Sequence, residues 1–245
     1  MPRAGEYTYF EKIGPEGRRH SINKPFSGAE TPRLFMDMGA LFSLLPPPPA
    51  RILECGCGTG WLCYFLARKG YDVVGQDCSS DAIQLARTNA LFTETGKVEF
   101  LCSDFEELGF ENEFDAVVFY AALHHAQRAR EAIHGACRAL RKGGVFVAVE
   151  PGRGHQAAAG KTIEKCDVGD RDMPPRLVVR EGRRAGFTET RIYQHPGQLT
   201  STLYAERPHS KALSGLWRIP GMRVIFLLAS ILFYKRFNGL VWMKK

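Results

Sequence analysis

The sequence has 245 residues and lacks several features that mark specialised classes of protein. No apolar run approaches the roughly 20 residues that a membrane-spanning helix requires. The first residues contain no apolar core of the kind found in secretory signal peptides, so we expect a cytoplasmic protein. No histidine and no second cysteine pair stands at zinc-binding spacing near the clustered cysteines, and we expect no metal site.

The cysteines do not form the pattern of a disulfide framework. They are odd in number, and most lie among apolar or small residues, which suits a reduced protein of the cytosol. The seven cysteines stand at positions 55, 57, 63, 78, 102, 137 and 166.

Acidic residues are almost missing from the last part of the chain. Glu206 is the only one after His195, against eight lysines and arginines, whereas residues 1–194 are neutral overall. The net charge of +7 therefore belongs to the C-terminal tail. This distribution weakens the interpretation of the whole chain as a nucleic-acid-binding domain.

Strand and helix patterns alternate regularly once the four prolines at 46–49 have ended an amphipathic helix at Thr31–Leu45. The expected strands are 51–54, 71–77, 98–104, 114–120, 145–150, 186–193 and 239–245. The expected helices between them are 61–69, 80–91, 128–141 and 174–185. This alternation predicts an α/β fold with a doubly wound, mostly parallel sheet and helices on both faces.

A glycine-rich loop follows the first of these strands and reads "ECGCGTGW", from Glu54 to Trp61. A dinucleotide-binding loop needs G-x-G-x-x-G, with a third glycine where strand and helix pack closely. Counted from Gly56, that third position is Trp61, a bulky side chain. The dinucleotide interpretation therefore fails at the position where size matters most.

The pattern E-x-G-x-G-x-G instead resembles the first motif of class I S-adenosylmethionine-dependent methyltransferases. Four further stretches agree with this family in order along the chain. They are Asp77 at the end of "VVGQD", "CSDF" at 102–105, "FDAVVFYAALHHA" at 114–126 and "LRKGGVFVAVEPG" at 140–152. The resemblance covers residues 48–151 closely and the later strands more loosely.

The resemblance implies a Rossmann-like sheet of seven strands with an antiparallel last strand, and S-adenosyl-L-methionine as the cofactor. In this family the acidic residue at Asp77 accepts hydrogen bonds from the ribose hydroxyls, Asp104 meets the adenine amino group and Phe105 its ring. Glu54 orients the glycine loop. The cofactor-binding residues implied in this way are Glu54, Gly56, Cys57, Gly58, Gly60, Asp77, Cys78, Asp104, Phe105 and Tyr120.

The same resemblance divides the chain into four parts. Residues 1–45 would form an N-terminal helical cap and 46–194 the cofactor-binding core. Residues 195–238 would be an apolar and basic insertion, and 239–245 the final strand of the core.

An oxygen acceptor in such an enzyme would profit from a base, because methyl transfer is an in-line displacement on an activated sulfonium. His124 and His125 follow the fourth strand, where open α/β sheets bind ligands, and His20 comes from a segment expected to fold over the cofactor. We take His124, His125 and His20 as candidate catalytic residues. Paired histidines at this place are often structural, and that alternative stays open.

The insertion contains the run "VIFLLASILFY", Val224 to Tyr234, with Arg218 and Arg223 before it, Lys235 and Arg236 after it, and Trp217 nearby. Basic flanks and an aromatic anchor favour a membrane-surface helix within 213–236. The alternative is burial in a cap or in a homodimer interface.

The expected function is S-adenosylmethionine-dependent methyl transfer to a small-molecule or lipid-linked acceptor, at oxygen, in the cytoplasm or at the inner face of the membrane. One alternative is a nucleic-acid methyltransferase, although no N-P-P-Y-type motif follows the fourth strand. The other is a non-catalytic binding protein, which would have no need to retain both the glycine loop and Asp77.

Overall fold

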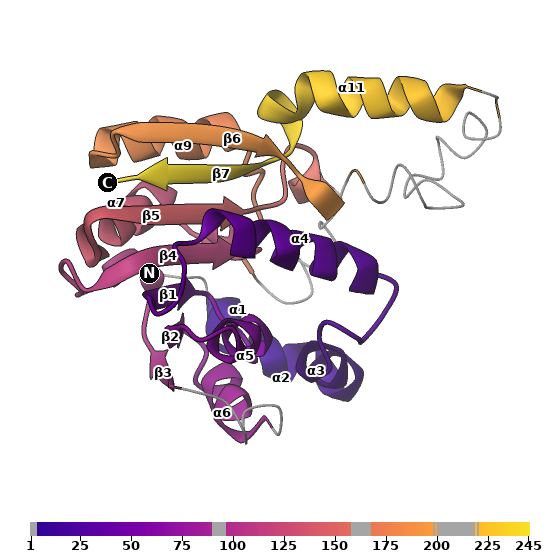
Figure 1. Cartoon of the computed structure of the whole chain (residues 1–245). Helices are drawn as coiled ribbons and strands as arrows, with labels where there is room; N and C mark the ends of the chain where they lie inside the picture. The colour runs from indigo at the N-terminus through magenta and orange to yellow at the C-terminus, as the bar shows by residue number, and fades with distance from the viewer. Residues whose placement is uncertain (1–3, 90–96, 158–167, 198, 200–218, 220) are drawn as a thin grey trace.

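The computed structural model describes residues 4–89, 97–157, 168–197, 199, 219 and 221–245. In these ranges the chain forms one seven-stranded sheet with the order β3-β2-β1-β4-β5-β7-β6 (Figure 1). β7 runs antiparallel to both β5 and β6, and the other neighbours are parallel. The strands are β1 Arg51–Cys55, β2 Asp72–Asp77, β3 Val98–Cys102, β4 Phe114–Tyr120, β5 Leu140–Val149, β6 Glu189–Gln194 and β7 Gly239–Lys244. The predicted fold class is confirmed.

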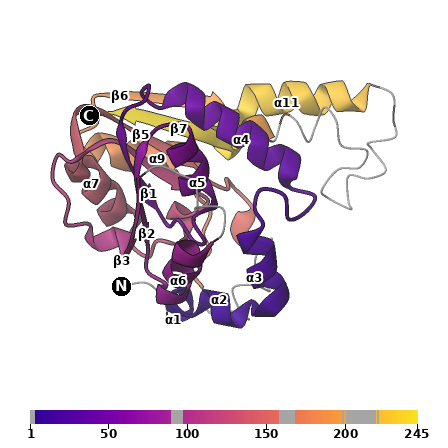
Figure 2. The same cartoon turned by 60° about the horizontal axis from the view of Figure 1, so that its bottom comes forward.

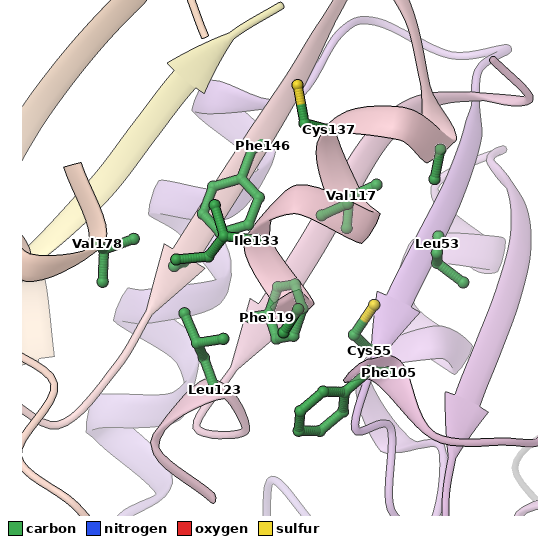
Figure 3. Close-up of a cluster of buried hydrophobic side chains, with 14 of the residues drawn as sticks. Leu53, Cys55, Phe105, Val117, Phe119, Leu123, Ile133, Cys137, Phe146 and Val178 are labelled. Atoms are coloured by element: carbon green, nitrogen blue, oxygen red, sulfur yellow. The ribbon is translucent and has the colours of Figure 1, made fainter. Parts of the chain in front are cut away.

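Helices cover the sheet on both faces, as expected for strands that read as short apolar runs. One face carries α7 (Ala129–Ala139) and α9 (Pro175–Ala185), whose side chains Ile133 and Val178 pack with Phe119 and Phe146 from the sheet (Figure 3). The other face carries α4 (Thr31–Leu44), α5 (Trp61–Arg68) and α6 (Ser80–Thr88). The central strands are therefore buried on both sides.

Three short helices precede α4: α1 (Ala4–Tyr7), α2 (Tyr9–Lys12) and α3 (Gly14–Ile22). Figure 2 shows them beside α6, and α2 and α6 are in contact. Two short 3-10 helices follow strands of the sheet, η2 (Phe105–Glu107) after β3 and η3 (Leu123–His125) after β4. The N-terminal helices thus lie near the carboxyl ends of the strands.

The register places the ends of β1, β2 and β4 next to one another. Cys55 pairs with Gln76 of β2 and with Phe119 of β4, so the loops that leave these strands emerge at one edge of the sheet. Ligands of open α/β sheets bind at this edge.

Several element boundaries differ from the sequence-based expectation: α6 ends at Thr88 instead of 91, β3 ends at Cys102 instead of 104, and β6 begins at Glu189 instead of 186. α7 ends at Ala139 instead of 141, and β5 already begins at Leu140, five residues before the expected start. Gly143 adopts a left-handed φ of 82°, and the pairing of β4 with β5 shifts register between Phe114 and Ala116. Glycine tolerates this conformation, so the strand can continue through an irregular stretch that apolar patterning does not reveal.

The apolar run in the insertion forms α11 (Met222–Phe237), which lies over the ends of β6 and β7 and extends away from the sheet (Figure 1). It contacts α9, β6 and β7. Within the described ranges, no helix is long and apolar enough to cross a membrane.

Candidate active site

The loop after β1 holds the chain in a shape that only glycine permits easily. Gly56 and Gly58 have φ values of 73° and 53°. The backbone N–H groups of Gly56 and Cys57 both donate to the carbonyl oxygen of Gln76, at 2.7 and 3.0 Å. A Cβ atom on Gly56 would lie 2.5 Å from Cβ of Ala122, which follows β4. The glycine loop is therefore pressed against the loop that carries the paired histidines.

A cavity of about 240 Å³ opens beside this loop. Eight of the ten residues predicted to bind the cofactor line it: Glu54, Gly56, Cys57, Gly58, Asp77, Cys78, Phe105 and Tyr120. The other two, Gly60 and Asp104, do not line the cavity. Gly60 precedes the first residue of α5 with a φ of 77°, and Asp104 caps η2 by accepting the N–H of Glu106 at 2.8 Å.

Asp77 binds the glycine loop as well as facing the cavity. One carboxylate oxygen accepts the N–H of Gly58 and the other that of Ser79, each at 2.9 Å. Burial raises the pKa of Asp77 above its ordinary value, against the effect of these two hydrogen bonds. Each carboxylate oxygen has a second lone pair, so two hydroxyl donors could still be accommodated.

The residues present fit the adenosine end of the expected cofactor. Oδ2 of Asp104 is buried without a hydrogen-bond partner in the described part of the chain, so it can accept a hydrogen bond from a ligand. Phe105 is buried beside it and contacts Phe119 edge-on, at 5.5 Å between ring centres. An adenine amino group and ring are the chemistry that such a pair would hold.

Glu54 is a buried carboxyl group at the end of β1. The thiol of Cys63 donates to its Oε2 at 2.9 Å. Burial, with a smaller contribution from the nearby Asp77 charge, raises the pKa of Glu54 to about 8. In this environment the side chain is largely protonated at neutral pH.

The N-terminal helices supply further walls of this cavity, which sequence reasoning did not find. Glu6, Tyr9, Phe10 and Lys24 all line it. The ring of Phe10 would lie 3.6 Å from a Cβ atom on Gly58, so it covers the glycine loop directly. From the sequence we expect only that this segment folds over the cofactor.

A second cavity, of about 500 Å³, adjoins the first and shares Arg33, Tyr120 and Ala121 with it. Its polar lining consists of Arg33, Tyr120, His124, Glu150, His155, His195 and Asn238. The second cavity thus adjoins the cavity that eight of the predicted cofactor-binding residues line.

Asp37 ties the elements around this second cavity together. It is fully buried in α4 and accepts hydrogen bonds from the Tyr120 hydroxyl at 2.9 Å and from the N–H of Gly197 at 3.2 Å. Arg33 donates to it at 3.3 Å, and Nδ1 of His195 lies 3.3 Å away. The sequence pattern indicates only that Asp37 lies in an amphipathic helix, so it does not predict that Asp37 connects the elements around this cavity.

The paired histidines lie at the wall between the two cavities. Nδ1 of His124 is 2.7 Å from Oε2 of Glu150, whose carboxylate also accepts the N–H groups of Ala122 and Leu123. Burial lowers the pKa of His124 below its ordinary value in spite of Glu150. For His125, burial acts in the same direction, but the Glu6 carboxylate outweighs it and the pKa is raised.

His20 lies elsewhere. Its Nε2 is 2.8 Å from Glu30 and its Nδ1 is 3.2 Å from the carbonyl oxygen of Ser27. It lines a separate groove between α3 and α6. A catalytic role for His20 stays a prediction without support from this position.

Comparison with known proteins agrees with this geometry. Residues 52–144 match the family described as "Methyltransferase domain". The glycine loop and strands β2 to β4 lie in the part of the chain that matches a methyltransferase domain, and the seven-stranded sheet has the Rossmann-like fold of class I methyltransferases.

Among curated proteins, the chain is similar to the ubiquinone biosynthesis O-methyltransferase of Alkalilimnicola ehrlichii, with 40% identity over 96 residues, 38% of each chain. It is also similar to the S-adenosyl-L-methionine-dependent Diels-Alderase iccD of Talaromyces variabilis, with 34% identity over 119 residues, 47% of this chain and 41% of that protein. The aligned part therefore spans about two fifths of these relatives.

Solved structures share the fold over nearly the whole chain. The [4+2]-cyclase SpnF has a TM-score of 0.67 at 15% identity and covers 100% of this chain and 96% of its own. The phosphoethanolamine N-methyltransferase 2 of Haemonchus contortus, in complex with S-adenosyl-L-methionine, has a TM-score of 0.67 at 17% identity. It covers 98% of this chain and 59% of its own.

Proposed function

We propose that the protein transfers the methyl group of S-adenosylmethionine to an oxygen atom of a small or lipid-linked acceptor. The observation that carries this proposal is the second cavity, which adjoins the cofactor cavity and is lined by histidine and carboxylate side chains. The named activity of the ubiquinone biosynthesis relatives, an O-methyltransferase, supports oxygen as the acceptor atom.

In this reaction the acceptor oxygen bonds to the methyl carbon while the carbon–sulfur bond breaks and its electrons pass to sulfur. The hydroxyl proton must also leave; His125 lines the first cavity and His124 the second, so both border the place where the two cavities adjoin. The N-terminal helices and α4 cover the site and would exclude water from it, which strengthens electrostatic interactions with the acceptor.

The test is methyl transfer from labelled S-adenosylmethionine to phenolic acceptors with short and long alkyl chains. We expect a labelled methyl ether together with S-adenosylhomocysteine. Asp77→Ala provides the cofactor-binding control. Tight cofactor binding with no methylated product from any hydroxylated acceptor would contradict the proposal and favour the alternative of a non-catalytic or cyclase-like protein, since a cyclase shares the fold.

We further propose that α11 rests on an anionic membrane surface and brings the site to a lipid-linked acceptor. Among the α11 side chains that the structure describes, none is buried. Leu228 is 52% exposed, Leu232 72% and Phe233 52%, and Ile225 is 59% exposed on the same helix. Such exposed apolar surface indicates an interaction site.

The positive charges near α11 favour an anionic membrane, instead of a second copy of the chain, as the partner of this helix. A cleft beside the C-terminal end of α11 is lined by four arginines and one aspartate, namely Arg153, Arg176, Arg180, Arg236 and Asp172. Moreover, α11 carries Arg223, Lys235 and Arg236 and no acidic residue, so a second α11 packed against it would add like charges and no complementary ones. Anionic headgroups would instead be attracted to these positive charges.

Sedimentation with vesicles tests this surface. We expect the protein to bind vesicles rich in phosphatidylglycerol, and the double variant Leu228→Asp with Leu232→Asp to lose this binding. Phe26→Asp is the matched control, because Phe26 is 70% exposed but lies near α3 and α4 instead of α11. Equal sedimentation of all three proteins, or a concentration-dependent dimer that the double variant abolishes, would contradict the proposal.

A further inference from the structure

Six ionisable side chains converge on the wall between the two cavities, although they come from distant parts of the chain. They are Glu6, His124, His125, Glu150, His155 and Asp170. In the part of the chain that the structure describes, His124, His125 and Asp170 each present one potential ligand atom, and these atoms lie within 4.8 Å of one another. The three side chains are therefore close enough together that they could hold a metal ion.

Glu150 determines which nitrogen of His124 is free. Its carboxylate accepts backbone N–H groups from Ala122 and Leu123 and, at 3.2 Å, from His124 itself. A carboxylate held in this way only accepts hydrogen bonds, so Nδ1 of His124, 2.7 Å away, carries the proton. Nε2 then presents a lone pair. This carboxylate–histidine pairing is the arrangement that orients metal-binding histidines.

The lone pair of His124 meets a carboxylate oxygen. Nε2 lies 3.3 Å from Oδ1 of Asp170, and that oxygen is also 2.7 Å from Nε2 of His155. Two electron-rich atoms so close repel each other unless a cation, either a proton or a metal ion, lies between them. Ligand atoms about 2.0–2.2 Å from one ion are themselves about 3.0–3.4 Å apart, which agrees with this separation.

His125 completes the set. Its buried Nδ1 makes no hydrogen bond of normal geometry in the described ranges, and its nearest charged partner is Oε1 of Glu6, 3.4 Å away. Both His124 and Asp170 are almost fully buried, so their polar atoms cannot rely on bulk water.

We propose that His124, His125 and Asp170 bind a divalent transition-metal ion, with Glu150 orienting His124 and His155 orienting Asp170. Two imidazoles and one carboxylate suit zinc, manganese, cobalt or iron(II), whereas magnesium and calcium prefer oxygen ligands alone. Three protein ligands leave coordination positions open, and His124, Glu150 and His155 all line the second cavity.

The role of the ion in catalysis rests on the proposed function. The binding of the ion does not depend on that function. An acceptor hydroxyl bound to it would lose its proton to water more readily, because the ion stabilises the resulting oxyanion. The oxygen would then attack the methyl carbon as described above. The expectation of no metal came from cysteine spacing, and spacing cannot detect ligands that follow different strands.

The test is a titration of the full chain, stripped of metal with a chelator, with Co²⁺ followed by its visible absorption and by metal analysis. We expect one equivalent bound, and binding weakened by at least roughly 10- to 100-fold in Asp170→Asn and in His125→Gln. Asp172→Asn is the matched control, because Asp172 belongs to the same loop but only accepts the N–H groups of Gly154 and Gln156.

Circular dichroism and cofactor affinity establish that each variant is folded. If the wild type binds Co²⁺ and both Asp170→Asn and His125→Gln bind it with the same affinity, the ion lies on other ligands, such as cysteines. This result would overturn the proposal. No binding by the wild type would also overturn it and leave a proton shared between His124 and Asp170. Metal binding without any methyl transfer would confirm the site and refute the proposed function instead.

Discussion

The Asp77 carboxylate combines two tasks, since it fixes the glycine loop through Gly58 and lines the cofactor cavity. Asp77→Ala should weaken S-adenosylmethionine binding on the order of tenfold to a hundredfold, because hydrogen bonds to a charged acceptor contribute about 1.5–3 kcal/mol. Calorimetry measures this, with Asp72→Ala at the opposite end of β2 as the control. Unchanged affinity in Asp77→Ala would mean that the ribose is held elsewhere.

Glu54 predicts a dependence of stability on pH. Its pKa is about 8 in the folded protein against an ordinary 4.5, so between these values the folded state holds a proton that the unfolded state has lost. The free energy of unfolding should therefore fall as pH rises through this window, by up to about 1.4 kcal/mol per pH unit from this group.

Urea unfolding of the cofactor-free protein at pH 5.5, 6.5 and 7.5 tests this sign. Glu54→Gln cannot ionise and should show a shallower decrease, whereas the exposed Glu131→Gln in α7 should follow the wild type. Parallel curves for Glu54→Gln and the wild type would show that Glu54 has an ordinary pKa.

At the scale of elements, the loop from β1 to α5 touches the loop after β4 through Gly56. Gly56→Ala should destabilise the protein more than Gly143→Ala, since both have a left-handed φ but only the first Cβ would collide, 2.5 Å from Cβ of Ala122. The left-handed strain alone costs about 1–2 kcal/mol. Thermal melts measure the difference, and equal losses would mean that the Ala122 loop moves away freely.

The elements themselves were largely predictable, because each strand is a short apolar run and each motif residue stands at a strand end. Asp77 and Tyr120 could be placed at the site from strand order alone. The contacts that shape the second cavity could not be predicted. Asp37 reaches Tyr120 and Gly197 across 83 and 160 residues of sequence, and no local pattern records such pairings. The contact of Phe10 with the glycine loop could not be predicted for the same reason.

At the scale of the whole molecule, the ends of the insertion meet. Gln194, at the end of β6, pairs with Gly239, at the start of β7. The 44 residues between them therefore begin and end at neighbouring positions of the sheet, where β6 and β7 pair directly.

Replacing residues 198–237 by a tight turn should therefore leave the fold and cofactor affinity nearly intact, since neighbouring antiparallel strands need only a short connection. Vesicle binding should be lost. Circular dichroism, calorimetry and sedimentation measure the three properties. An unfolded product would show that α11 is needed by the sheet that it contacts.

The pairing of Gln194 with Gly239 has a consequence for how the protein can vary in evolution. A segment whose two ends are joined by strand pairing can lengthen, shorten or be exchanged without disturbing β1, β2 and β4, whose carboxyl ends border the candidate site. The outer surface of the protein can therefore vary between relatives independently of that site.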